Sequence, residues 1–321
     1  MADLTRVANA LTPDVWDKYF NEFTAELSAI RQSGIMETLA GFNVPSEGKT
    51  VNMPFWQDLT GEDEIWTSGH ETQPEAIFAK KDAAVILTRI KSYGAEDLVK
   101  LFSGSDPMAA IVLKFANYWN RREQLILLSI LKGVFGTALA ENMKDKSSES
   151  ISRNMLVDAI NVMGDASTDL TGMLMHSAVQ ADLAKKSVLD ARVNVGDTNA
   201  PPEFETFLKR RIIVDDGAPV ENVGTSTDPE MVYTTYLFGQ GALAYAAGTP
   251  DNSIEIVREG LKSQTSLVHR RQFIMHPRGV SWVGNPVKNT PSNAELATAA
   301  NWVKVFERKN IPIVALRHQI G

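Results

Sequence analysis

The strongest constraint on the fold is a long helix-forming stretch in the middle of the chain. Residues 106–144 open with Asp106 and Pro107, which favour the N-cap and the first position of a helix. No further proline interrupts the stretch, and apolar residues recur three, four or seven apart, which predicts a helix with one apolar face. We expect the core side of this helix to hold Val112, Phe115, Trp119, Ile126 and Ile130.

A helix of this length constrains the shape of the whole molecule. At ~1.5 Å per residue it would extend over roughly 55 Å, beyond an ordinary globular helix. Gly133 and Gly136 are the positions at which it would bend or end early. Other elements must lie across such a helix to bury its apolar face, so the sequence predicts an elongated or flat molecule.

Composition argues against several functional classes. The 321 residues include no cysteine, which excludes disulfides, thiolate nucleophiles and Cys-ligated metals. The net charge of −7 argues against a general nucleic-acid-binding or membrane-binding surface. The sequence has no run of about 18 apolar residues, and residues 1–10 lack the apolar core of a signal peptide. We therefore expect a soluble protein that is made in a cytoplasm and binds no membrane.

The N-terminal part predicts a loose arm followed by an aromatic helix. Residues 1–11 are polar, Thr12 to Asp14 form a helix start, and Gly34 is placed as a stop. The helix has an unusually aromatic face for its place so near a terminus. Two interpretations of that face stay open, a core helix of this chain or a helix that packs on another subunit. The aromatic residues of the second interpretation are Trp16, Phe20 and Phe23.

Residues 49–93 predict an extended β-hairpin with a polar tip. Strand-like runs at 49–57 and 84–93 flank an acidic span, in which Trp66 lies, with Trp56 at its base. A large apolar side chain on an exposed arm normally needs a surface that covers it. Trp66 therefore either folds back on its own domain or contacts another subunit. The tip also carries three acids, which belong to the same hypothetical inter-subunit surface and are expected to be solvated rather than to bind a cation: Glu62, Asp63 and Glu64.

The rest of the chain divides into two kinds of sequence. Residues 155–252 contain short β-like runs between turns rich in Gly, Pro, Asn and Asp, which predicts a small α+β domain. Residues 94–154 and 253–321 contain the long helix and a closing strand at 311–316, and we expect them to form one domain.

No group of residues has the spacing of an active site. His176 and Ser177 are adjacent, whereas a nucleophile and its base normally meet across a fold. Asp215 and Asp216 precede Gly217 after a strand-like run, which predicts a turn. Phosphate-binding and dinucleotide-binding glycine patterns are missing. The sequence therefore predicts no enzyme, no catalytic residue, no metal and no cofactor. A hydrolase that uses His176 with Asp215 or Asp216 is the remote alternative.

Four phrases, together with the order of the parts, carry a family resemblance. They are LFSGSDPMAAI at 101–111, MLMHSAVQADLAKKSVL at 173–189, RIIVDDGAP at 211–219 and YTTYLFGQGAL at 233–243. The chain resembles the major capsid proteins of tailed double-stranded-DNA bacteriophages, which have the Hong Kong 97 fold. The likeness extends from about residue 11 to about residue 320.

The resemblance implies an α+β fold of four parts. These are an N-terminal arm and helix (1–48), an extended loop that lies over a neighbouring subunit (49–93), a peripheral domain with a spine helix (94–154 and 253–321) and an axial domain at the capsomer centre (155–252). It also implies a structural protein that assembles with itself into hexamers and pentamers of an icosahedral virion shell in the cytoplasm of a bacterial host. The shell would enclose double-stranded DNA without sequence-specific binding.

The same resemblance implies the partners. Because the first predicted helix begins at Thr12, the sequence leaves no room for an N-terminal scaffolding region. We therefore expect either a separate scaffolding protein or a chain that has already been processed, and Met1 favours the separate protein. A portal and decoration proteins would be further partners of a procapsid that matures. A bacterial nanocompartment shell of the encapsulin type, which has the same fold, is the alternative function.

Overall fold

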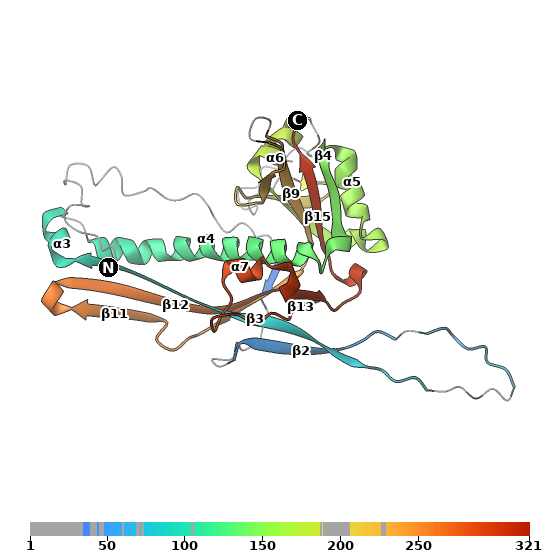
Figure 1. Ribbon diagram of the computed structural model, residues 1–321, viewed down its shortest axis with the longest axis horizontal. Coiled ribbons are helices and arrows are strands. Elements are labelled where there is room, and N and C mark those ends of the chain that lie inside the picture. Colours follow the sequence, from blue (N-terminus) through green and yellow to red (C-terminus); the bar gives the residue numbers. More distant parts are fainter. Residues whose placement is uncertain are drawn as a thin grey trace, which may run out of the picture.

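The molecule is elongated and is built around one long helix (Figure 1). The computed structural model describes residues 35–38, 44, 48–59, 61–68, 71, 74–103, 106–186, 188, 206–225 and 229–321. The long helix, α4 (Pro107–Gly136), runs along the molecule with one sheet beside it and a second sheet packed near its C-terminal end. None of the helices in these residues is both long and apolar enough to cross a membrane.

Helix α4 begins at the predicted position. The Asp106 carboxylate accepts the backbone N–H groups of Met108 and Ala109, and Pro107 occupies the first turn. The side chains of Phe115, Trp119, Ile126 and Ile130 are buried. Val112 is 57% exposed, so its expected place in the core is wrong. The apolar cluster under this end of α4 is formed by Phe115, Trp119 and Leu267 and does not extend to Val112.

Helix α4 is shorter than the predicted 106–144, because it ends at Gly136. The helix continues through Gly133 and ends at Gly136, the second of the two positions at which the sequence allows a bend or an end. Gly133 instead permits the close approach of the short helix α7 (Asn293–Leu296), since a Cβ at this position would lie 2.1 Å from the carbonyl oxygen of Leu296. The missing side chain serves packing and not helix termination.

A turn, the short helix η2 (Ala140–Asn142) and the first residues of strand β4 (Met143–Ser150) stand where the end of the helix is predicted. Strand β4 pairs in parallel with the last strand, β15 (Ile313–Gln319), which is 172 positions away at the pair Asp145 and Arg317. The buried Asn142 amide fixes the junction, donating to the carbonyl oxygens of Ile311 and Ile313 at 3.2 and 3.0 Å. Pairing with a distant strand therefore decides the structure of a polar segment that has little local preference.

The six-stranded sheet lies beside α4 and carries the predicted hairpin. Its strand order is β1-β10-β12-β3-β2, with β11 also paired to β12. Strand β2 pairs antiparallel with β3, so that Trp56 lies opposite Ala79, and the loop 57–78 projects from that end of the molecule (Figure 1). Pro54 is tolerated because β2 is an edge strand. The strands are β1 (Met36–Thr38), β2 (Thr50–Trp56), β3 (Ala79–Glu96), β10 (Leu243–Gly248), β11 (Ile254–Glu259) and β12 (Gln264–Pro277).

The seven-stranded sheet forms the second unit together with helices α5 and α6 (Figure 1). Its order is β4-β15-β9-β5-β7-β6, with β8 also paired to β9. Apolar residues of both helices and of the strands form one buried cluster. The elements not yet given are α5 (Arg153–Asn161), α6 (Ser177–Lys185), β5 (Leu170–Met175), β6 (Thr206–Phe207), β7 (Arg210–Val214), β8 (Val220–Asn222) and β9 (Met231–Gly239).

Sheet membership differs from the predicted division of the chain in three places, the first of which is β1, a strand of the six-stranded sheet that lies inside the predicted arm and helix at 1–48. Strands β4 and β15 belong to the seven-stranded sheet, although the sequence predicts residues 94–154 and 253–321 in the domain of the long helix. Strand β10, which lies inside 155–252, pairs with β12 in the six-stranded sheet. Composition along the chain follows local segments, whereas a sheet is assembled from segments that are distant in sequence.

Small elements complete the described residues and connect the two sheets. A two-stranded sheet, β13 (Val280–Trp282) with β14 (Trp302–Lys304), lies near the middle of the molecule. The side chains of Trp282 and Trp302 are buried, and their ring centroids are 5.0 Å apart. One apolar cluster includes residues of α4 and of both large sheets, so the two units share a core. The remaining short helices are α3 (Asp97–Ser103), η2 (Ala140–Asn142), η3 (Gly164–Asp169), η4 (Gly260–Lys262), η5 (Ala299–Asn301) and η6 (Arg308–Asn310).

Candidate functional site

The residues of the hypothetical hydrolase site cap a helix. His176 precedes α6, and its Nδ1 accepts the backbone N–H of Ala178 at 3.1 Å. Because this nitrogen accepts, it carries no proton for Asp216, whose Oδ1 lies 3.9 Å away. Ser177 donates to Asp216 through its backbone N–H at 3.3 Å and through its hydroxyl, and the hydroxyl bond lowers the pKa of the Asp216 carboxyl. The hydroxyl is directed at a carboxylate and not at the imidazole, unlike the order of a catalytic triad.

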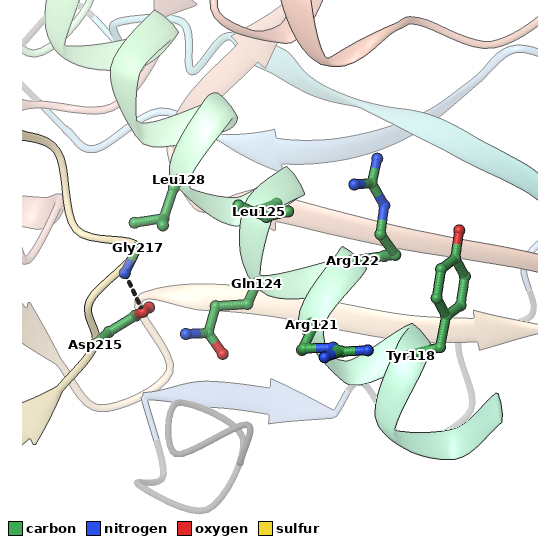
Figure 2. A pocket seen from close by; sticks show the side chains of 8 residues that line it. All are labelled: Tyr118, Arg121, Arg122, Gln124, Leu125, Leu128, Asp215 and Gly217. Atoms are coloured by element: carbon green, nitrogen blue, oxygen red, sulfur yellow. Dashed lines mark hydrogen bonds between the residues drawn. The ribbon is translucent and has the colours of Figure 1, made fainter. Parts of the chain in front are cut away.

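Asp215 and Asp216 form the turn that the sequence predicts after β7. Asp215 Oδ1 accepts the backbone N–H of Gly217 at 2.7 Å, drawn as a dashed line in Figure 2. The carbonyl oxygen of Asp215 accepts from Ala218 at 3.0 Å. Within the part of the chain that the structure describes, no group of three or more His, Asp or Glu side chains is placed to hold a metal ion.

The loop 57–78 exposes large apolar side chains to solvent. Trp66 is 91% exposed and Trp56 is 67% exposed. Trp66 thus does not fold back onto its own subunit in this structure. The same loop carries six acidic residues and no lysine or arginine, among them the exposed Glu62, Asp63 and Glu64. A large apolar side chain that stays in water among like charges is costly for an isolated subunit, which indicates a surface that becomes covered.

Sequence reasoning missed other exposed apolar residues of this loop. They are Leu59, Ile65, Ile77 and Phe78, which are 81%, 81%, 48% and 66% exposed. Single apolar residues between acids and prolines have no periodicity that separates them from an ordinary polar loop. The available indication was Trp66 itself, since its neighbours share its surroundings.

A second group of exposed apolar residues lies at the opposite end of the molecule. On α3 it includes Leu101 and Phe102, which are 76% and 61% exposed. On the edge strand β11 it includes Ile254 and Ile256, which are 63% and 68% exposed. Figure 1 shows α3 and the turn between β11 and β12 at one end and the loop 57–78 at the other. The molecule therefore exposes apolar side chains to solvent at both ends of its long dimension.

A hollow of about 390 Å³ opens on the flank of α4, near its N-terminal end. Three aromatic rings form its wall. The ring centroid of Tyr93, on β3, lies 5.4 Å from that of Phe115 and 5.9 Å from that of Tyr118. Lys114 and Arg121 of α4 line its rim. We call this hollow the aromatic pocket, and the residues that line it are Tyr93, Pro107, Ala110, Ile111, Lys114, Phe115, Tyr118 and Arg121.

A second hollow of about 320 Å³ continues from the aromatic pocket along α4, because Tyr118 and Arg121 line both. Figure 2 shows Arg121 and Tyr118 on one side of this hollow and the turn at Asp215 and Gly217 on the other. The two hollows together expose a strip of α4 that is aromatic and positively charged. Sequence reasoning missed this strip, because it assigned only the apolar face of α4 to contacts.

The N-terminal aromatic residues Trp16, Phe20 and Phe23 lie outside the described residues. Their expected role in contacts between subunits stays a prediction.

Comparison with solved structures identifies the architecture as that of Hong Kong 97-like capsid proteins. The chain is similar to the capsid of Ralstonia phage GP4 with a TM-score of 0.67 and 10% identity, over 90% of this chain and 88% of that one. It is also similar to the holo-SrpI encapsulin complex from Synechococcus elongatus PCC 7942, with a TM-score of 0.51 and 10% identity over 75% of this chain and 76% of that one. At such identities these likenesses show the fold alone.

Sequence comparison shows the family. Residues 128–311 match the model of the Gp13-like family, described as major capsid protein 13-like. The major capsid protein of Bacillus phage SPP1 is 37% identical over 328 aligned positions, which cover 98% of each chain. A full-length match of this kind extends over the helix, the loop and both sheets. The chain belongs to the Gp13-like family of bacteriophage major capsid proteins.

Proposed function

We propose that this protein builds the icosahedral head of a tailed bacteriophage by assembling with copies of itself into hexamers and pentamers. The observation that carries the proposal is the loop 57–78, on which Trp66 is 91% exposed on an arm that leaves the subunit. A monomeric protein gains nothing from such an arm, whereas a closed symmetric assembly repeats each contact around the shell. Membership of the Gp13-like family supports the same role.

Each part of the fold takes one task in this proposal. The loop 57–78, at the end of the hairpin predicted over 49–93, reaches a neighbouring subunit, and the same role for the arm and helix predicted in 1–48 is an expectation of the family resemblance. The six-stranded sheet and α4 form the peripheral domain, and the seven-stranded sheet forms the axial domain, which meets its copies at the capsomer centre. Strands β4 and β15 join the axial domain, and β10 joins the peripheral domain, which refines the division into 94–154 with 253–321 and 155–252.

The protein acts structurally and without catalysis in this proposal. Its contact with double-stranded DNA is not sequence-specific, since a net charge of −7 offers little counter-charge for phosphates and lets packed DNA move along the inner wall. A separate scaffolding protein, a portal and decoration proteins are the further partners. The protein is found in the virion, after assembly in the cytoplasm of the host.

Electron microscopy of the purified protein tests the proposal. We expect closed shells with five-fold and six-fold capsomers when the chain is produced with its scaffolding protein, and nuclease-resistant DNA inside particles from infected cells. Subunits that stay monomeric at every concentration, with or without the scaffolding protein, would contradict it. Particles that enclose a cargo enzyme in place of DNA would support the encapsulin alternative.

A further inference from the structure

We propose that the aromatic pocket on α4 receives Trp66 from the loop of a neighbouring copy, with the acids beside Trp66 pairing with the basic rim of the pocket. The inference rests on the proposed function and adds to it the two surfaces that meet. The inference uses only described residues, Trp66 and the acids beside it within 61–68 on one copy and the lining of the aromatic pocket on the other.

The pocket is suited to an indole side chain. Phe115, Tyr93 and Tyr118 hold one another in edge-to-face contacts at 5.4, 5.9 and 6.2 Å, so the wall exists before anything binds. A volume of about 390 Å³ admits a large side chain. The rings offer edge-to-face packing, and the Tyr118 hydroxyl can accept the indole N–H, which normally finds a partner when it is buried.

The charges of the two surfaces are complementary. Lys114 and Arg121 line the pocket, and Arg122 lines the hollow that continues from it. The loop carries Glu62 and Asp63 within four residues of Trp66 and contains no lysine or arginine. Cations near an aromatic ring also stabilise it directly, through the negative face of the ring. A neutral or basic occupant would gain only the aromatic part of this contact.

The loop of the same subunit cannot reach the pocket. Tyr93 of the pocket and Ala79 at the loop base lie on one strand, β3, 14 positions apart, which is about 45 Å at ~3.3 Å per residue. Trp66 is 10 positions from Trp56, which pairs with Ala79, so its tether extends at most about 36 Å. The loop also points away from α3 and the start of α4 (Figure 1). The contact must therefore join two copies.

A contact between opposite ends of identical subunits is head-to-tail. Such heterologous contacts close into rings when the rotation between copies allows it. A loop tip at one end and a pocket at the other thus provide the same contact between each pair of neighbouring subunits around a capsomer.

Disulfide trapping in assembled shells tests the proposal, and the absence of native cysteine makes the test clean. The variant Thr67→Cys, Lys114→Cys keeps Trp66 and should form a ladder of covalent oligomers up to the hexamer when shells are oxidised. The control is Thr67→Cys, Leu113→Cys, since Leu113 is 73% exposed on another side of α4 and does not line the pocket. We expect at least about tenfold more cross-linking for the first pair than for the control.

Charge exchange provides a second measurement. Lys114→Glu should raise the subunit concentration needed for assembly about tenfold, which corresponds to the loss of one modest charged contact. Adding Glu62→Lys should recover most of the loss, whereas adding Glu230→Lys, outside the loop, should recover none. Thiol labelling of Lys114→Cys should be at least tenfold slower in shells than in free subunits.

The outcomes separate this inference from the proposed function. Complete shells with equal cross-linking of the two pairs, or with none, would overturn the pocket contact and leave the capsid role intact. Slow labelling of Lys114→Cys already in the free subunit would also overturn it, because the subunit's own chain would then fill the pocket. A wild-type protein that forms no shells would instead contradict the proposed function.

Discussion

The seven-stranded sheet buries its apolar side chains within the subunit, whereas the loop 57–78 leaves its apolar side chains exposed to solvent. In the sheet, Met173, Leu237 and Val314 are fully buried against residues of α5 and α6 in one cluster. In the loop, Trp66, Ile65 and Leu59 are all more than four-fifths exposed. The first region can reach its free-energy minimum as a single chain, whereas the second can do so only after a partner covers it.

This difference separates folding from assembly within one subunit. The sheet, α4 and their shared core provide the stability of the monomer, so the loop is free to carry surface that only a neighbour completes. A two-stranded hairpin is marginal in water by itself. Repetition around a closed shell compensates for the weakness of each contact. Changes in the loop should therefore impair assembly without lowering the stability of the free subunit. Changes in the core should lower that stability.

Removing the loop tests the separation most severely. Replacing residues 58–75 with a short Gly-Ser link should leave a folded, soluble subunit that builds no complete shells. The circular dichroism spectrum should stay near native, because neither α4 nor the seven-stranded sheet changes. Sedimentation should show monomers or small oligomers in place of a fast particle peak. Shells of normal size and stability from the shortened chain would show that the loop is dispensable.

Two tryptophan substitutions compare the regions directly. Trp119→Ala should lower the free energy of unfolding of the free subunit by about 3–5 kcal/mol. Trp119 is 2% exposed, its Nε1 donates to Nδ1 of His269 at 2.7 Å, and the guanidinium of Arg271 lies 5.9 Å from its ring. Trp66→Ala should change the same quantity by no more than about 0.5 kcal/mol, because a surface substitution removes few contacts.

Urea denaturation of both unassembled variants measures the contrast. The opposite ranking would mean that Trp66 packs on its own subunit and that the core near the start of α4 is dispensable.

The Gly133 position tests how tightly α4 packs against α7 and β14. Gly133→Ala should destabilise the subunit by about 1–3 kcal/mol, as overpacked sites do, even though alanine favours a helix. The new methyl group would lie 2.1 Å from the carbonyl oxygen of Leu296 and 2.7 Å from Nε1 of Trp302. Gly260→Ala is the matched control, since nothing lies within 4 Å of its added Cβ. Equal melting temperatures for both variants would argue that α7 moves aside at no cost.

Local sequence signals predicted the start of α4, the hairpin and the turn at Asp215, because each depends on residues that are close in the chain. Asp106 and Pro107 determine the helix start through their own side chains. Gly136, one of the two glycines at which the sequence allows an early end, is also the last residue of α4. The strand β4 that follows was not predictable in this way, because it depends on pairing with β15 and no local pattern in residues 143–150 encodes that pairing.

The candidate contact surfaces were predictable only in part. Trp66 stood out as a large apolar residue among acids, which is a contrast visible in the sequence. The aromatic pocket did not stand out, because it combines Tyr93 of β3 with residues of α4. Its basic rim, Lys114 and Arg121, belongs to a face of α4 that composition alone assigns to solvent. A surface formed by two elements requires their relative placement, which the three-dimensional structure provides.

The smallest expected effect on stability concerns two histidines, one in each of the two large sheets. Burial lowers the pKa of His269, next to α4, with a further contribution from the charge of Arg271. Burial also lowers the pKa of His318, in the seven-stranded sheet. A lowered pKa means that the unfolded chain binds protons more readily than the folded one. The stability that each neutral imidazole contributes is therefore present above the unfolded value of about 6.5 and is lost as the pH falls through the lower folded value.

Protonation would act on different contacts at the two sites. At His269, the proton would occupy Nδ1, which accepts from Trp119, so acid should weaken the attachment of α4 to β12. At His318, Nε2 meets the Thr235 hydroxyl at 2.9 Å inside the seven-stranded sheet. His269→Gln keeps an acceptor near the indole and removes the titration, and His318→Gln does the same in the other region. Urea denaturation at pH 7 and pH 5 should show a smaller loss of stability on acidification in each variant than in the wild type. If His269→Gln loses as much stability as the wild type between these pH values, the imidazole beside Trp119 is not what acid disrupts at the junction of α4 and β12.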